Sequence, residues 1–350
     1  MCIRDRGSSR PERPSSSVSV CVVNHRARDL LRECLLSLRR HPYNGGPMEV
    51  VVLDNASGDG SLDMLSADFP EVAVLAESQR RGFGANQNRA IAASHGDLVF
   101  ILNPDSVVHE GTIDRLVASL DWDPRIAAAG GPTINADGSF RQNRLHDFHT
   151  PFSPYAKAMG LSRIRSSRPM ERGATADGWP SGGACLVRRD VFDELGGFDE
   201  RYFMYAEDAD LAASLVRRHY LVAWVDDAVV THPFPTESAT ASARREAEKV
   251  RSELRYIRKH YGQLGEQLYR AGMVVDAASR VALLSIPGLT RLVRRHGKST
   301  GEARRRHQAR LENALSPYKN PGLAELAEGW NRQHPPPGGQ NDPAGPRAEA

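Results

Sequence analysis

The segment Asn103-Pro104-Asp105 places an amide oxygen and a carboxylate two residues apart, directly after the apolar run from Leu98 to Leu102. Oxygen ligands of this kind suit a hard divalent cation such as Mg²⁺ or Mn²⁺, which could in turn hold a diphosphate. The same residues are good turn formers, so a plain turn after a strand is the competing interpretation.

Other polar residues also stand where predicted elements begin or end. Asp54 follows an apolar strand and could either bind a ligand or cap the next loop. Glu207 and Asp208 open a predicted helix, where the helix dipole favours acids for structural reasons alone. His232 follows the apolar pair Val229-Val230 and could be a ligand or a satisfied strand-end histidine.

The elements around these residues indicate an α/β protein. Near-continuous apolar strands are predicted over 18–23, 49–53 and 98–102, with a weaker strand over 72–76. The helix predicted over 29–40 follows the first of them, and this alternation is typical of a parallel sheet with right-handed crossovers. Ligands of open α/β sheets bind at the carboxyl ends of strands, where the polar residues stand.

The pair Gly82 and Gly84 invites comparison with the glycine fingerprint of dinucleotide-binding proteins. The third glycine position is occupied by Gln87, and the pair follows a third strand instead of the first. The sequence therefore argues against a Rossmann dehydrogenase.

Charge is distributed unevenly along the 350 residues, whose net charge is +3. Between Arg244 and Arg310 there are 17 Lys/Arg and 6 Asp/Glu, a local excess of +11 that leaves about −8 elsewhere. A basic region suggests an anionic partner, either a membrane surface or nucleic acid, but no nucleic-acid-binding motif accompanies it. Cys21 and Cys34 fall on apolar faces, as expected of reduced cysteines in a cytosolic protein.

Four segments are predicted from composition. Residues 1–17 and 316–350 are expected to be disordered tails, 18–241 one domain, and 242–315 a basic helical extension. The apolar residues of 270–295, flanked by arginines, suit either helices lying on a membrane surface or helices packed on the core. No secretory signal and no run of 18 apolar residues is found.

Five blocks, in this order, resemble the family 2 glycosyltransferases of GT-A fold, and within them the bacterial rhamnosyltransferase-type enzymes. They are VSVCVVNHR, VVVLDNASGDGS, RRGFGANQNRAI, LVFILNPDS and GGFDERYFMYAEDADLAASL. The resemblance covers 18–232 and implies the nucleotide-diphospho-sugar transferase fold: a mixed, mostly parallel sheet flanked by helices, here with a C-terminal helical extension.

The resemblance also implies a set of donor-binding residues. Asp54 would accept hydrogen bonds from a pyrimidine base, and Arg81 would lie under the diphosphate and sugar. The full set is Asn24, His25, Asp54, Asn55, Arg81, Gly82, Asn86 and Asn103.

The remaining implied roles concern metal binding and catalysis. Asp105 would be the main ligand of Mg²⁺ or Mn²⁺, because Asn103 replaces the first acid of the family's Asp-x-Asp motif, and His232 would complete the metal shell. Asp208 would be the general base that takes the acceptor's proton, so that transfer proceeds with inversion. Trp179, as a sugar platform or a core residue, would contact the acceptor with Gly182, Gly183 and Glu207.

The function that the resemblance implies is metal-dependent, inverting sugar transfer in cell-envelope glycan synthesis. dTDP-rhamnose is the first choice of donor, with UDP-galactofuranose, UDP-hexoses and GDP-sugars as alternatives, and the acceptor would be lipid-linked or a polysaccharide. The enzyme would be cytoplasmic and peripheral on the inner face of the membrane, bound to an anionic surface. A sugar-nucleotide-binding scaffold without catalysis is the alternative class, and nucleic-acid binding ranks last.

Overall fold

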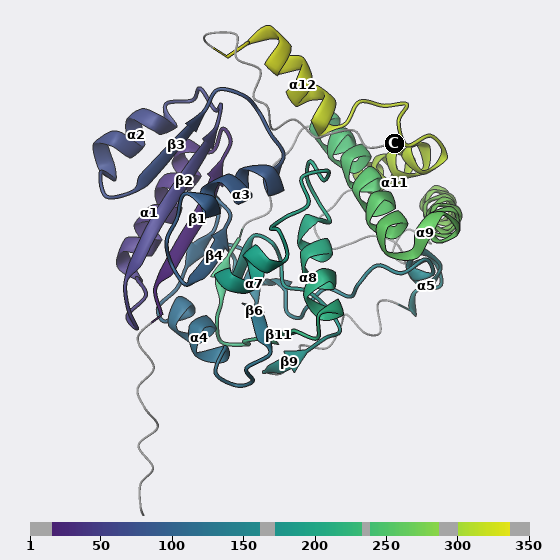
Figure 1. The fold of residues 1–350 in the computed structure, drawn as a ribbon. Coiled ribbons are helices and arrows are strands. Elements are labelled where there is room, and N and C mark those ends of the chain that lie inside the picture. The colour runs from purple at the N-terminus through teal and green to yellow at the C-terminus, as the bar shows by residue number, and fades with distance from the viewer. Residues whose placement is uncertain (1–15, 162–171, 233–238, 287–299, 337–350) are drawn as a thin grey trace, which may run out of the picture.

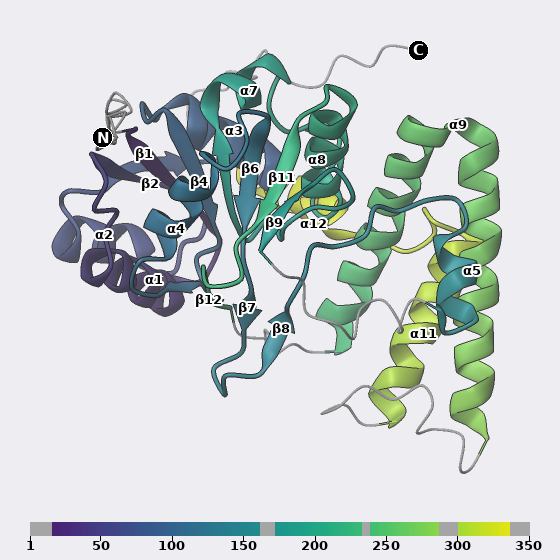
Figure 2. The ribbon, with the colours of Figure 1, turned by 90° about the horizontal axis from the view of Figure 1, so that it is seen from below.

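The computed structural model describes residues 16–161, 172–232, 239–286 and 300–336. A central mixed sheet carries helices on both faces, and a group of C-terminal helices lies beside it (Figures 1 and 2). The strand order of the sheet is β3-β2-β1-β4-β10-β6-β11-β9. These strands are β1 (Val18–Asn24), β2 (Met48–Asn55), β3 (Ala73–Glu77), β4 (Leu98–Leu102), β6 (Ile126–Gly130), β9 (Gly173–Thr175), β10 (Ala184–Arg188) and β11 (Leu221–Trp224).

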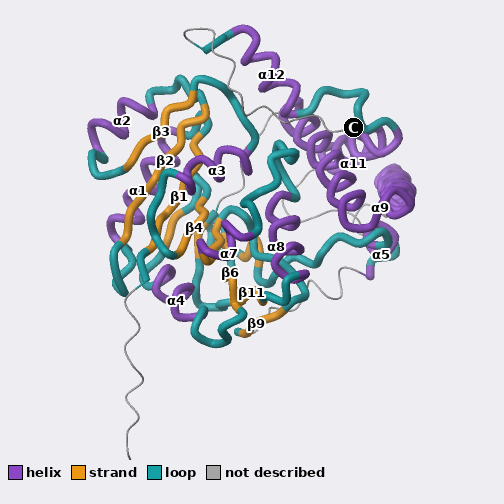
Figure 3. The backbone as a smooth tube through the Cα atoms, viewed as in Figure 1, coloured by secondary structure: helices purple, strands orange, loops and turns teal. Residues whose placement is uncertain are grey.

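Strand direction in this sheet agrees with the sequence-based expectation. β3, β2, β1 and β4 are parallel to one another, whereas β10 runs antiparallel to both β4 and β6, and β9 runs antiparallel to β11. Every residue of β1, β4 and β6 is buried, as continuous apolar strands covered on both faces require. The predicted mixed, mostly parallel α/β sheet is confirmed, and Figure 3 shows it in orange with purple helices around it.

Two hydrophobic layers hold helices against the two faces of the sheet. On one face, Leu31, Leu35 and Leu38 of α1 are buried against the sheet at helical spacing. This layer contains α1 (Arg28–Arg40), α2 (Ser61–Asp68) and α4 (Thr112–Ser119). The opposite layer contains α3 (Phe83–Ala92), α7 (Arg189–Glu194) and α8 (Glu207–Arg217).

A small second sheet connects the end of the domain to the loop that follows β4. Its strands, in spatial order, are β5 (Val107–Val108), β12 (Val230–Thr231), β7 (Thr133–Ile134) and β8 (Phe140–Gln142). Thr231 pairs with Val107, so the residue that follows β12 is brought beside the loop before β5.

The C-terminal helices form a separate hydrophobic cluster. α9 (Ala239–Ser285) changes direction at Gly262, whose φ of +74° is readily adopted only by glycine, and its two halves lie side by side in Figure 2. α5 (Ser153–Ala158) and α11 (Thr300–Leu315) pack on α9. Tyr256, Tyr269 and Met273 are fully or almost fully buried among them.

α12 (Leu323–Gln333) is a helix within a segment expected to be disordered. The expectation is wrong for these residues because proline and glycine dominate only the flanks of the segment, whereas LAELAEGW consists mainly of helix-forming residues. The side chain of Glu325 accepts a hydrogen bond from the backbone of Gly322 at 2.8 Å, which caps the first turn.

The structure favours one of the two interpretations of residues 270–295. Met273, Ala277 and Leu284 are buried within the helical group, so the side of the helix that carries them is covered by the protein itself, whereas Val275 and Ile286 are about half exposed. Pro287 and Gly288, which interrupt the apolar run of this segment, lie outside the described residues. Among the helices that the structure describes, none combines the length and the apolar character needed to cross a membrane.

Candidate active site

The carboxyl ends of three parallel strands place the predicted polar residues at one edge of the sheet. Asn24 at the end of β1 is directly opposite Asp54 on β2, and Val22 of β1 is opposite Leu102, the last residue of β4. Asn103, the residue that follows β4, therefore lies at the same edge of the sheet. The sequence predicted this grouping correctly, because strand direction and strand ends follow from the apolar pattern.

Asp54 is held rigidly and is only 2% exposed. Its Oδ1 accepts a hydrogen bond from Asn24 Nδ2 at 2.8 Å, and its Oδ2 accepts one from the backbone N–H of Ser57 at 3.1 Å. The Asn24 amide also donates to Ser57 Oγ and Ser61 Oγ, at 3.1 and 2.9 Å. Because Asn24 is fully buried, it orients Asp54 and does not line a ligand site itself; the two serines were not anticipated from the sequence.

The loop before α3 is fixed by two asparagines. Asn55 accepts a hydrogen bond from the backbone N–H of Arg81 at 2.9 Å and donates to its carbonyl at 3.1 Å. Asn86 donates to the same carbonyl at 3.3 Å. A Cβ on Gly82 would lie 2.5 Å from the Phe203 carbonyl oxygen, so the packing of the chain itself requires this glycine.

His25 is exposed beside this loop. Its Nδ1 lies 2.9 Å from the Asn55 carbonyl oxygen. Partial desolvation of the ring and the nearby cations Arg80 and Arg26 lower the pKa of His25, against the opposing effects of the Asn55 hydrogen bond and Asp54. The ring therefore carries little positive charge at neutral pH.

The predicted metal ligands meet although 127 residues separate them in the chain. His232 Nε2 lies 3.0 Å from Asp105 Oδ1 and 3.3 Å from Asn103 Nδ2. Two ligand atoms about 2.1 Å from one ion and at right angles are about 3.0 Å apart, so Asp105 and His232 fit a divalent cation. Within the part of the chain that the structure describes, no three His, Cys, Asp or Glu side chains gather as metal ligands.

Gly182 and Gly183 connect the metal residues to the predicted base. The backbone N–H of Gly182 donates to Asp208 Oδ2 at 3.1 Å. A Cβ on Gly183 would lie 2.7 Å from Asn103 Nδ2 and 3.2 Å from His232 Cε1. The two glycines thus allow Asp208 and the metal residues to approach the same stretch of backbone from opposite sides.

Both side chains predicted to contact the acceptor, Trp179 and Glu207, are buried. Trp179 is 7% exposed and stacks on Phe148, with ring centroids 5.5 Å apart, so it packs in the core and is not an open sugar platform. Glu207 is 6% exposed. Burial and the neighbouring Asp208 raise the pKa of Glu207 well above its usual value. Glu207 is therefore a neutral interior group at the start of α8.

Backbone strain is concentrated around this edge of the sheet. Of the five non-glycine residues with positive φ in the described ranges, four flank the predicted site residues: Arg26, Ala56, Tyr205 and Ala206. The last two directly precede Glu207 and Asp208. Such conformations cost about 1–3 kcal/mol each and persist where the surrounding structure enforces them, typically at functional sites.

Buried polar atoms without partners are found at the same edge. Among the described residues, they include Asn24 Oδ1, Arg80 Nε, Asn86 Oδ1 and Glu207 Oε2. Buried polar groups are nearly always hydrogen-bonded, so these atoms have capacity for a further partner such as a bound water.

Gly183→Ala tests the close packing between the glycines and the metal residues. Because the added methyl group overlaps Asn103, we expect the free energy of unfolding to fall by about 1–3 kcal/mol. We also expect the metal concentration that gives half-maximal activity to rise. Gly173→Ala is the matched control, since a Cβ there meets nothing within 4 Å. Urea unfolding and metal titration of both variants measure the effect, and equal behaviour would contradict the packing argument.

Comparison with known proteins places this architecture in a class. A mannosyltransferase from Pyrobaculum calidifontis, solved with GDP-Man and Mn²⁺, superimposes with a TM-score of 0.57 at 19% identity, over 86% of this chain and 88% of that one. GalNAc-T7, solved with UDP, GalNAc and Mn²⁺, superimposes with a TM-score of 0.55 at 15% identity, over 91% of this chain and 58% of that one. The fold is that of the GT-A glycosyltransferases, as predicted.

The sequence model of Glycosyl transferase family 2 matches residues 19–196, and the chain belongs to this family. An N-acetylglucosaminyl-diphospho-decaprenol L-rhamnosyltransferase of Mycobacterium tuberculosis is 33% identical, over 53% of this chain and 66% of its own length. The O-antigen chain rhamnosyltransferase RfbN of Salmonella typhimurium is 26% identical, over 53% of this chain and 57% of its own length. The chain thus spans between 57% and 66% of the length of these relatives and resembles bacterial rhamnosyltransferases.

Proposed function

We propose that this protein transfers a sugar from a nucleoside diphosphate donor to an acceptor hydroxyl with inversion. The observation that carries the proposal is the convergence of Asp54, the Asp105–His232 pair and Asp208 at one edge of the sheet. Asp54 provides a hydrogen-bond acceptor for the nucleotide base, and the Asp105–His232 pair would hold a cation at the diphosphate. Asp208 is bonded to Gly182, which is followed directly by Gly183 beside Asn103 and His232.

Asp105 and His232 would hold Mg²⁺ or Mn²⁺, a set with few protein ligands that leaves positions for phosphate oxygens and water. When bound, the cation neutralises the charge that develops on the leaving diphosphate. Asp208 takes the proton from the acceptor hydroxyl as this oxygen attacks the sugar carbon opposite the diphosphate. The hydrogen bond from Gly182 to Oδ2 fixes the direction of the carboxylate.

The proposed donor is dTDP-rhamnose. Its support is the similarity to the Mycobacterium tuberculosis and Salmonella rhamnosyltransferases. The GT-A structures were solved with GDP-Man and with UDP, so the fold by itself does not select a nucleotide, and UDP- and GDP-sugars are the alternatives.

The proposed acceptor is a lipid-linked glycan of cell-envelope synthesis, as the name of the mycobacterial relative indicates for that protein. Such an acceptor would bring the enzyme to the inner face of the membrane. Because the side of α9 that carries Met273 and Ala277 is covered by protein, we attribute membrane contact to the acceptor and to basic surface residues.

The test is nucleotide release from dTDP-, UDP- and GDP-sugars with Mg²⁺, with Mn²⁺ and with EDTA. We expect slow, metal-dependent hydrolysis of one donor, reduced about 10²-fold by Asp105→Ala because a main ligand of the cation is lost. Asp226→Ala, which removes an exposed carboxylate, is the control. Failure of the wild-type protein to bind or hydrolyse any of these donors would overturn the proposal.

A further inference from the structure

The helix α12 reaches back across the molecule to the loop between β3 and α3 (Figure 1). Asn331 accepts a hydrogen bond from the backbone N–H of Arg80 at 2.8 Å and donates to the Arg80 carbonyl at 2.9 Å. Gln79 Nε2 donates to the His334 carbonyl at 2.8 Å. These bonds join segments about 250 residues apart and fix the backbone of the loop.

The Arg80 side chain is held by the same helix. Its guanidinium carbon lies 4.1 Å from the centroid of the Trp330 ring, the geometry of a cation–π contact. Trp330 stacks in turn on His334, with centroids 4.2 Å apart and planes at 10°. The aromatic support therefore fixes the position of the guanidinium without neutralising it.

Arg80 lies beside the residues assigned to nucleotide binding. Its NH2 group donates to the Ala56 carbonyl at 3.4 Å, and Ala56 follows Asp54 and Asn55 at the end of β2. The next residue, Arg81, is bonded to Asn55 through its backbone. The guanidinium is thus carried by the loop that faces the proposed base pocket.

The charge around Arg80 is unbalanced. Arg81 forms an ion pair with Glu77 at 2.8 Å, but within the described ranges no carboxylate pairs with Arg80 or with the neighbouring Arg26. Burial, followed by the charge of Arg26, lowers the pKa of Arg80. Arg80 is thus a partly buried cation whose charge is available to pair with an anion.

We infer that α12 is part of the nucleotide subsite and that it holds Arg80 to bind the phosphates of the donor. This inference rests on the proposed function and moves the phosphate contact from Arg81, which is already paired, to Arg80. Guanidinium groups suit phosphate oxygens because they offer several N–H donors in one plane.

Calorimetric titration of dTDP, UDP and thymidine into the full chain tests the inference. One of the two diphosphates, dTDP or UDP, should bind the wild-type protein more tightly. We expect Arg80→Ala to lower the affinity for that diphosphate about tenfold or more and to leave the affinity for thymidine within about twofold of wild type. Trp330→Ala should weaken the same diphosphate in the same selective way, and Trp330→Phe should restore most of the affinity. Arg332→Ala, an exposed residue of the same helix, is the control.

The outcomes separate the inference from the proposed function. If the wild-type protein binds neither diphosphate, the dTDP- and UDP-sugar forms of the proposed function fail and the inference fails with them. If the wild type binds and Arg80→Ala binds the diphosphate equally well, only the inference is overturned. An equal loss of thymidine and diphosphate in folded Arg80→Ala, as judged by thermal unfolding, would also overturn it, because this would show a general role in shaping the pocket.

Discussion

Asp208→Asn is expected to lower the rate of sugar transfer by about 10²–10⁴-fold while leaving donor affinity within about threefold. The amide has nearly the shape of the carboxylate but cannot accept the acceptor's proton. Asp208 Oδ1 accepts a hydrogen bond from the backbone N–H of Ala209 at 2.8 Å, which the amide oxygen can retain, whereas the amide NH2 group cannot accept the bond that Oδ2 receives from Gly182. The expected rate defect therefore comes mainly from the loss of the base, with a smaller structural cost from the lost Gly182 bond.

Single-turnover transfer, with donor binding measured separately, checks this expectation. Asp226→Asn is a control for the loss of one negative charge from the surface, and it should transfer sugar at the wild-type rate. Transfer by Asp208→Asn at more than about a tenth of the wild-type rate would show that another group accepts the proton.

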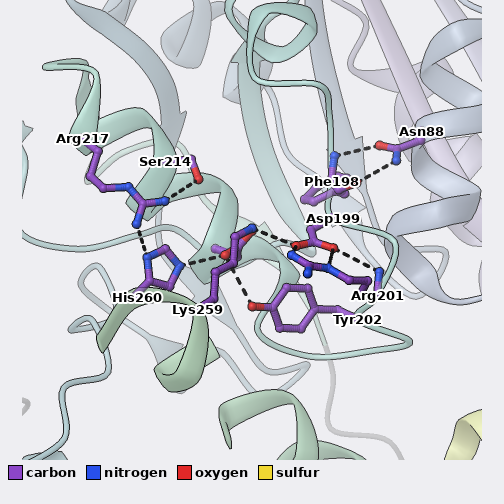
Figure 4. Close-up of polar contacts among 10 residues, drawn as sticks. Asn88, Phe198, Asp199, Arg201, Tyr202, Ser214, Arg217, Lys259 and His260 are labelled. Carbon is purple, nitrogen blue, oxygen red and sulfur yellow. Dashed lines mark hydrogen bonds and ion pairs between the residues drawn. The ribbon is translucent and has the colours of Figure 1, made fainter. Parts of the chain in front are cut away.

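Asp210→Ala is expected to reduce the free energy of unfolding by about 3 kcal/mol, because it leaves buried charged and polar groups without their partner. Asp210 is 3% exposed and accepts hydrogen bonds from Lys259 Nζ and His260 Nε2, each at 2.7 Å. Both donors belong to α9, as Figure 4 shows for Lys259 and His260. The interaction therefore attaches the C-terminal helices to α8, which carries Asp208.

A second acid, Asp199, limits the loss of stability expected for Asp210→Ala. Lys259 also pairs with Asp199 at 2.8 Å, and Asp199 pairs with Arg201 at 2.6 Å, so one cation keeps a partner in the variant (Figure 4). Urea unfolding measures the effect, with Arg258→Ala as the control: the Arg258–Glu266 pair is exposed on the arginine side and should contribute less than about 1 kcal/mol. Equal stability of the two variants would show that Asp210 does not anchor α9.

Close contacts of the candidate site could be only partly predicted from local patterns. Gly82 was assigned to the donor-binding set, but the carbonyl of Phe203 occupies the space that a side chain there would need. Trp179 could be read as a sugar platform or as a core residue, and burial at 7% exposure supports the second. A sequence pattern shows that a glycine or an aromatic ring is present, but the neighbour that meets it comes from a distant segment.

The sequence by itself determined the elements and their polar ends. The apolar runs before Asn24, Asp54 and Asn103 define parallel strands whose ends must meet, because strand period and chain direction are local properties. The family blocks likewise identified Asp105 and Asp208 as the residues to examine. These features depend on residues close together in the chain.

The tertiary structure alone decided which side chains share an environment. It placed His232 3.0 Å from Asp105 through the pairing of β12 with β5. It buried Asn24 behind Asp54, and it brought Trp330 of an expected disordered tail onto Arg80. Such contacts depend on the packing of segments between 30 and about 250 residues apart, which no local period or composition encodes.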